Sequence, residues 1–161
     1  MEGFEAWYTA EHPRVLSACV ALSGDYDAAR EATDEAFTRA LERWSQVESM
    51  ASPGGWVQTV AINALRRGLR RRRLERGLRR GLSAPPLPDP ELWLVVRSLP
   101  PRQQTVIVLA YVHDLPQTTI AEVMGIAPGT VSSTLDAARR GLRRRLAEPV
   151  DSEEERLRWL T

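Results

Sequence analysis

The residues between Leu115 and Leu146 carry the pattern with the clearest chemistry, because their types suit contact with DNA. A helix that begins at Pro128 would point free backbone N–H groups and the positive end of its dipole toward phosphate. Short polar side chains near its start would let it enter a major groove start-first. The residues expected to contact DNA are Pro128, Gly129, Thr130, Ser132, Ser133, Thr134, Ala137 and Arg140.

The helices that must position these residues are indicated by the spacing of apolar side chains. Gly125 is expected to end the first helix, since glycine permits the left-handed backbone of a helix end. In the second helix, apolar residues recur at steps of four, three, four and four, which predicts one buried seam. This pattern is typical of a helix-turn-helix, and an ordinary helical hairpin with a solvated basic end is the alternative. The seam consists of Val131, Leu135, Ala138, Leu142 and Leu146.

A second candidate cluster lies on a helix expected from Pro53 to about Leu74. Ser52 before Pro53 is a good start, because a capping side chain precedes a proline. Residues 66–80 hold nine arginines and one acidic residue, a net charge of +8. A charge run is usually a solvated face, but one this basic favours a polyanionic partner. One polar face of this helix carries Thr59, Asn63, Arg66, Arg67 and Arg70.

A third helix, expected from Tyr26 to Trp44, has one apolar face rich in alanine and one acidic face. Asp25 is expected to cap its start, and Gly24 to end the helix before it. That earlier helix is expected to begin at Pro13, after a separate first helix. The acidic face includes Asp27, Glu31, Asp34, Thr38 and Glu42, and a loop is expected from Ser45 to Ser52.

Composition narrows the class of protein. Residues 1–65 hold four arginines and ten acidic residues, a net charge of −6. Residues 81–161 hold nine arginines and ten acidic residues, a net charge of −1. A single cysteine excludes a disulfide framework, and two histidines argue against a zinc site. We therefore expect no metal and no cofactor. With no apolar run long enough for a membrane span and no signal-peptide pattern, a cytoplasmic protein is expected.

The organisation predicted is all-α, with two small helical domains joined by a linker. Residues 1–75 form the first domain, and residues 91–147 form the second. Residues 76–90 are rich in proline and glycine and form the linker. Asp89 before Pro90 is expected to restart helix, and residues 148–161 form an acidic C-terminal tail.

With both halves laid out, roughly residues 4–146 resemble an extracytoplasmic-function sigma factor, a small RNA polymerase specificity subunit of the sigma-70 family. The second half is similar to region 4, and the first half to region 2. Each motif alone is weak, but their order, spacing and proline linker make the combination strong. The matching residues are Asp34-Glu35-Ala36-Phe37, Trp44, Pro53, Trp56, Thr59-Val60-Ala61, Asn63, Leu99-Pro100-Pro101-Arg102-Gln103, Ile120-Ala121-Glu122, Gly125 and Gly129-Thr130-Val131.

This resemblance implies partners for each cluster. Core RNA polymerase would be bound through the clamp and flap of its β subunits, with Glu31, Asp34, Glu35 and Thr38 meeting the clamp. Thr59, Asn63 and the arginines behind them would hold single-stranded promoter DNA at the minus-ten element, together with the loop at 45–52. The second helix of the helix-turn-helix would read the minus-thirty-five element. An anti-sigma factor is a further candidate partner, and the acidic tail is a weak candidate for contacting it.

Some positions depart from the family pattern. Ser132 and Thr134 stand where basic residues are frequent, which lowers the attraction for phosphate at this helix. Ile62 replaces a frequent arginine, and Thr118 and Thr119 replace usual acidic residues. The chain is therefore expected to be a divergent member.

Two other classes of function compete with this interpretation. A free-standing helix-turn-helix regulator would explain residues 99–146 but leave the acidic helix and the Asn63 face without a role. An enzyme is disfavoured, because the sequence shows no phosphate-binding glycine loop and no Ser–His or Cys–His arrangement beyond chance.

Overall fold

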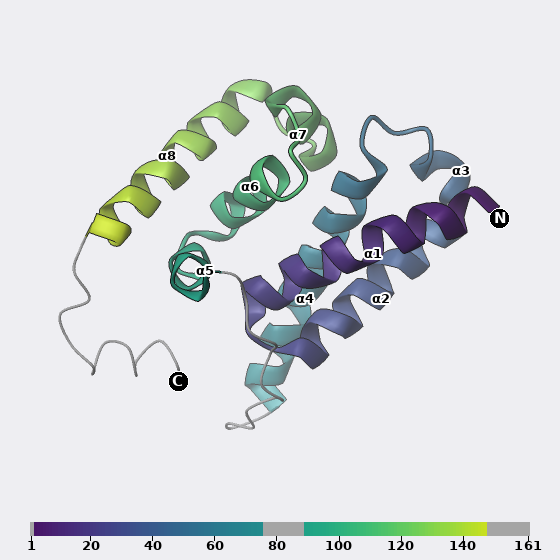
Figure 1. The fold of residues 1–161 in the computed structure, drawn as a ribbon, viewed down its shortest axis with the longest axis horizontal. Helices are drawn as coiled ribbons and strands as arrows, with labels where there is room; N and C mark the ends of the chain where they lie inside the picture. Colours follow the sequence, from purple (N-terminus) through teal and green to yellow (C-terminus); the bar gives the residue numbers. More distant parts are fainter. Residues whose placement is uncertain (1, 76–88, 148–161) are drawn as a thin grey trace.

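The computed structural model describes residues 2–75 and 89–147, and every regular element in those two ranges is an α-helix (Figure 1). Residues 76–88 of the predicted linker and the whole predicted tail, 148–161, lie outside the described residues. No helix in the described part of the chain is both long and apolar enough to cross a bilayer. The helices are α1 (Glu2–Ser23), α2 (Tyr26–Glu42), α3 (Trp44–Val47), α4 (Pro53–Glu75), α5 (Pro90–Arg97), α6 (Pro101–Tyr111), α7 (Gln117–Met124) and α8 (Pro128–Ala147).

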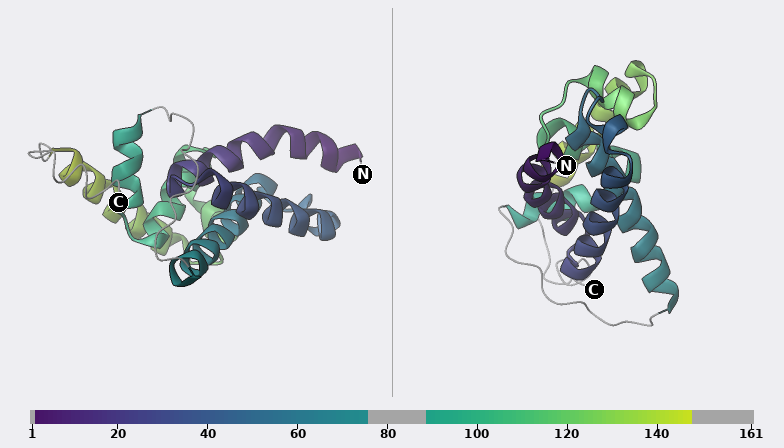
Figure 2. Two further views of the ribbon diagram at one scale, coloured as in Figure 1. Left: turned by 90° about the horizontal axis from the view of Figure 1, so that it is seen from below. Right: turned by 90° about the vertical axis from the view of Figure 1, so that its right-hand side faces the viewer.

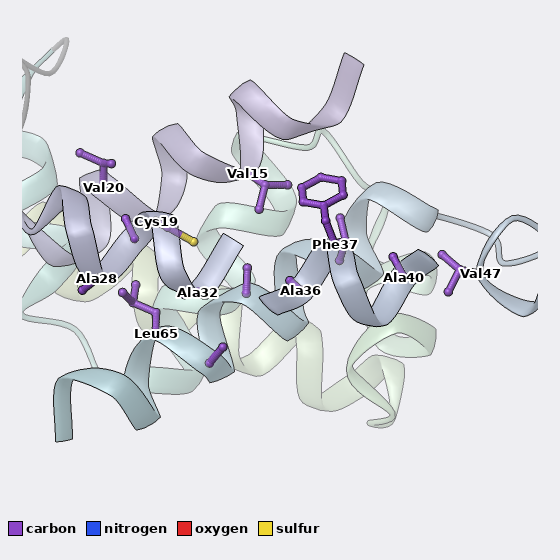
Figure 3. Packing of buried hydrophobic residues seen from close by; sticks show 14 residues of the cluster. Val15, Cys19, Val20, Ala28, Ala32, Ala36, Phe37, Ala40, Val47 and Leu65 are labelled. Atoms are coloured by element: carbon purple, nitrogen blue, oxygen red, sulfur yellow. The ribbon is translucent and has the colours of Figure 1, made fainter. Parts of the chain in front are cut away.

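Helices α1, α2 and α4 pack around a core built largely from small side chains (Figure 3). The α2 alanines at positions 29, 32, 36 and 40 are all buried, as the apolar pattern predicted, and Ala28 is buried as well. Small side chains at a helix contact allow the helix axes to approach closely, while Phe37 and Leu65 fill the remaining space. The Asp25 carboxylate accepts a hydrogen bond from the backbone N–H of Ala28 at 2.9 Å, which confirms the predicted cap.

Helix α1 corrects the prediction that a new helix begins at Pro13, since it runs unbroken from Glu2 to Ser23. Proline removes one backbone hydrogen bond inside a helix and can kink it. Here the apolar residues on both sides of Pro13 pack on the same core, Trp7 before it and Val15 after it. Tertiary packing therefore carries the helix through the proline.

The expected loop at 45–52 is partly helical, because α3 occupies Trp44–Val47. Val47 is fully buried, and the Trp44 ring lies 4.8 Å from the ring of Trp7. These contacts hold the short helix against the first domain, a tertiary effect that local composition does not show. As predicted, α4 starts at Pro53, and the Ser52 hydroxyl accepts a hydrogen bond from the Gly55 N–H at 3.0 Å.

Helices α5 to α8 surround a second core. Its predicted boundaries are confirmed, because Asp89 caps α5 through the Leu92 N–H and Gly125 ends α7 with φ of 63°. The α8 seam is buried at Val131 and its next two members, and Leu142 is partly buried. Leu146 was predicted to be buried as well, but it is 54% exposed, because the last turn of α8 extends past the other helices.

The two groups of helices pack directly against each other. Helix α4 contacts α6 and α7, and α1 contacts α5, so α5–α8 lie along one side of the first domain (Figures 1 and 2). A small apolar cluster of Ala18, Ile62 and Val108 lies at this boundary and is buried from solvent. The Arg97 Nε donates to the Ala21 carbonyl at 2.5 Å across the same boundary. The sequence pattern does not indicate this contact.

Candidate nucleic-acid and protein interfaces

The polar face predicted on α4 is largely exposed. Asn63, Arg67 and Arg70 are exposed, and Thr59 is partly buried with its hydroxyl donating to the Gly55 carbonyl at 3.0 Å. The exposed amide of Asn63 offers donors and an acceptor, a combination that can match the edge of an unpaired base. Arg67 and Arg70 lie one and two turns further along, where a guanidinium can meet phosphate.

Arg66, predicted to belong to this face, lies elsewhere. Its guanidinium donates to the Pro101 carbonyl and, at 3.1 Å, to the Thr105 hydroxyl, so it is engaged by the second domain. Burial there lowers the pKa of Arg66 from its usual value. A helix turns about 100° per residue, so Arg66 and Arg67 face different partners although they are adjacent.

The acidic residues Glu31, Asp34 and Glu35 and the hydroxyl of Thr38 are all exposed on α2, as predicted. Two of the carboxylates are already paired within the first domain. Glu35 accepts from Arg39 at 2.6 Å and from Arg67 at 2.8 Å, and Glu31 lies 2.7 Å from Arg72. The acidic face of α2 and the basic face of α4 therefore neutralise each other in part.

The start of α8 presents the residues predicted to contact DNA. Pro128, Gly129, Ser133 and Arg140 are exposed. The Ser133 hydroxyl donates to the Thr130 carbonyl at 3.1 Å within the first turns. The partly buried members are Thr130, Ser132, Thr134 and Ala137. The predicted set thus lies along α8 from its first residue to Arg140, and most of its side chains are small.

The structure also brings together polar residues that sequence reasoning missed. His113, Gln58 and Glu11 meet at the boundary between the domains, although they come from distant parts of the chain. The sequence signal for this contact is a glutamine inside the apolar stretch at 57–62 and a histidine directly after the one at 106–112. Neither position indicates which residues pair.

The described residues include possible metal-ligating side chains and the cysteine thiol. Nowhere in residues 2–75 and 89–147 do three metal-ligating side chains gather in a group that could hold an ion. Cys19 is buried, and burial raises the pKa of its thiol to about 12, so the group stays neutral. Cys19 packs in the core of the first domain as a small apolar side chain.

Comparison with known families identifies both halves of the chain. The model for sigma-70 region 2 matches residues 7–75, and the model for sigma-70 region 4 matches residues 90–142. Together they cover most of the chain, including the α2 and α4 faces in one region and α8 in the other. A free-standing regulator that needs only a helix-turn-helix is therefore not supported.

Individual proteins show the same relationship. The RNA polymerase sigma-E factor of Streptomyces coelicolor is 28% identical over 151 residues, which is 89% of this chain and 85% of that protein. The RNA polymerase sigma factor YlaC of Bacillus subtilis is 25% identical over 171 residues, 97% and 98% of the two chains.

A solved structure shares the fold at lower identity. It is the sigma factor RpoE of Bartonella quintana, crystallised with the anti-sigma factor NepR. It superposes with a TM-score of 0.75 at 20% identity, covering 94% of this chain and 100% of that one. The chain belongs to the sigma-70 family as an extracytoplasmic-function type of RNA polymerase sigma factor, a non-enzymatic subunit that directs promoter recognition.

Proposed function

We propose that the α4 face and the start of α8 bind different elements of the promoter. The exposed α4 face captures unpaired promoter DNA at the minus-ten element, and the start of α8 reads the minus-thirty-five duplex. The observation that carries this is the exposed Asn63 beside two exposed arginines, Arg70 and Arg67, of which Arg67 pairs with Glu35 at 2.8 Å. An amide can select a base, whereas arginines bind any phosphate.

The acidic face of α2 is the proposed contact with basic helices of the polymerase clamp, and the second domain would meet the flap of the β subunit. Asp34 is 60% exposed, and the His12 imidazole lies 4.0 Å from its carboxylate, which leaves the carboxylate accessible. A protein with these partners would work in the cytoplasm. The structural relationship to a sigma factor that was crystallised with NepR supports an anti-sigma factor as a further partner.

Domain boundaries follow from the same assignment. We propose that residues 1–75 bind polymerase and melt the promoter, and that residues 91–147 carry duplex recognition. The linker at 76–90 would let the two act at separate elements, and the tail at 148–161 would lie outside both.

The test compares two kinds of variant in the full chain with core polymerase. Asn63→Ala should weaken open-complex formation on a matched promoter while leaving most affinity for arbitrary DNA. The double variant Arg67→Gln with Arg70→Gln should weaken binding to all single strands. It should also flatten the salt dependence of binding by about 0.7 for each phosphate that is no longer neutralised. Arg66 is left unchanged because it contacts the second domain.

A promoter with a pre-opened bubble separates base capture from melting. The Asn63→Ala defect should persist on the bubble if the amide binds a base, and disappear if the residue only assists strand separation. If Asn63→Ala behaves as wild type on both templates, the assignment of the α4 face is wrong.

A further inference from the structure

The contact between the two domains uses a third face of α4. Gln58, Ile62 and Arg66 lie four residues apart, so they form one stripe along the helix. Ile62 is 1% exposed and packs with Val108 of α6, while Arg66 binds the carbonyl and hydroxyl at the start of α6. This stripe is covered only while the second domain stays docked.

Gln58 and His113 form the polar centre of that contact. The Gln58 Nε2 donates to the Cys19 Sγ at 3.7 Å, which leaves its Oε1 facing the His113 Nε2 at 2.8 Å. Since Oε1 can only accept, the imidazole Nε2 must carry a hydrogen and donate. In a neutral ring the Nδ1 then holds a lone pair and no hydrogen.

The groups around His113 do not offer its Nδ1 a good acceptor. Glu11 of α1 is the nearest carboxylate, but its Oε2 lies 3.9 Å from Nδ1 and has no hydrogen-bond partner among the described residues. Arg14 of α1 lies 3.6 Å from the other Glu11 oxygen and offsets its charge. The group that α4 places against His113 is the neutral amide of Gln58, and the Cys19 thiol bonded to that amide is neutral too. Asp114, the next residue after His113, is exposed to solvent.

An added proton would therefore place an imidazolium in a site with poor solvation. The His113 side chain is 2% exposed, and burial together with Arg14 lowers its pKa from 6.5 to about 4. If the second domain undocks, the ring becomes hydrated and regains its ordinary affinity for the proton.

We propose that His113 is an acid-sensitive latch, in which proton uptake at Nδ1 releases the second domain from the Gln58–Ile62–Arg66 stripe of α4. The proton comes from solvent and converts the neutral ring to an imidazolium cation. The N–H bond at Nδ1 is the only covalent bond that forms. The docked state would be the resting state, and acid would free Arg66 for nucleic acid. That last consequence rests on the proposed function of α4, whereas the latch itself does not.

The direction and size follow from linkage. The open form binds the proton more tightly than the docked form, so falling pH favours opening. With an ordinary pKa of 6.5 in the open form and about 4 in the docked form, the opening constant rises about eightfold between pH 7 and pH 5.5. Below about pH 4 both forms are protonated, and the effect levels off.

A buried thiol reporter can measure small changes in opening. Ala18→Cys, in a Cys19→Ser background that keeps a hydrogen-bond acceptor for the Gln58 Nε2, places a thiol in the cluster with Ile62 and Val108. Its rate of reaction with dithiodipyridine, divided by the rate for Thr9→Cys on the exposed side of α1, gives the open fraction at each pH. This ratio should rise about eightfold from pH 7 to pH 5.5.

The two histidines of the chain supply the matched controls. His12→Gln should keep the pH dependence, because His12 lies away from the contact, beside Asp34. His113→Gln should abolish it, whether the variant is mostly docked or mostly open. A reporter in the core of the first domain, Ala29→Cys, should react far more slowly and show that the domain itself stays folded.

Three results would overturn the latch. The reporter rate could be independent of pH, the pH dependence could survive in His113→Gln, or acid could slow the reaction because Glu11 captures the new N–H and tightens the contact. None of these measurements uses DNA or polymerase, so they leave the proposed function to its own test. Conversely, a failed Asn63→Ala experiment would leave the latch standing.

Discussion

Two adjacent residues on α4 have different partners. Arg66 and Arg67 are adjacent arginines, yet one binds the second domain and the other pairs with Glu35. The sequence predicted both on one nucleic-acid face, because their spacing from Asn63 fits a helix. It could not show that Arg66 lies close to residues about 35 positions later, since nothing local encodes that contact. The charge run therefore predicts a basic helix but not the partner of each arginine.

Asp34 allows a residue-level test of polymerase binding. Asp34→Lys should reduce co-purification with core polymerase by at least about tenfold, because it reverses a charge on the face proposed to meet basic helices. The helical circular dichroism should be unchanged, since the side chain is 60% exposed. Glu5→Lys, which makes the same charge change on exposed α1, is the control and should bind normally. Equal binding by both variants would refute the assigned face.

At the scale of elements, the prediction from sequence was most accurate where local chemistry decides. The structure contains the predicted helix starts at Asp25, Ser52–Pro53 and Asp89–Pro90, and the predicted helix end at Gly125. These were predictable because helix capping and glycine geometry act over a few residues. The errors lie at Pro13, where packing overrides the proline, and at α3, which depends on distant aromatic rings.

The α8 seam gives a prediction with an internal control. Leu135 is 2% exposed within the second core, so Leu135→Ala should lower the free energy of unfolding by about 2–5 kcal/mol. Leu146→Ala, on the same helix but 54% exposed, should change it by no more than about 0.5 kcal/mol. Urea denaturation followed by circular dichroism measures both. Similar decreases for the two would mean that the end of α8 packs in solution.

At the scale of the whole molecule, two domains that the sequence presents separately act as one packed unit in the structure. Ile62 illustrates why sequence reasoning misses this, because an isoleucine in place of a frequent arginine indicates only a missing charge. The structure shows instead that it fills the boundary with Ala18 and Val108. A pattern read along one helix reveals which faces are apolar, but not which distant segment covers them.

Global stability should also depend on His113. The folded chain holds the pKa of this side chain at about 4, below its ordinary 6.5. As the pH falls, the unfolded chain therefore takes up the proton first, and the free energy of unfolding decreases. Between pH 7 and pH 5 the decrease due to this residue should be about 2 kcal/mol. Urea titrations of wild type and His113→Gln at both values measure it, and the variant should be destabilised less on acidification. An identical decrease in the two proteins would show that other groups account for it.

The stripe on α4 also has an evolutionary consequence. The amide at 58 and the imidazole at 113 satisfy each other in a site closed to water, so a change at one leaves the other buried without a partner. Among relatives that keep this docking, positions 58 and 113 should therefore covary, and so should positions 66 and 105. The exposed positions 63 and 70 should instead drift with the promoters that each relative recognises. A lineage that loses the histidine would then be expected to replace the glutamine soon after.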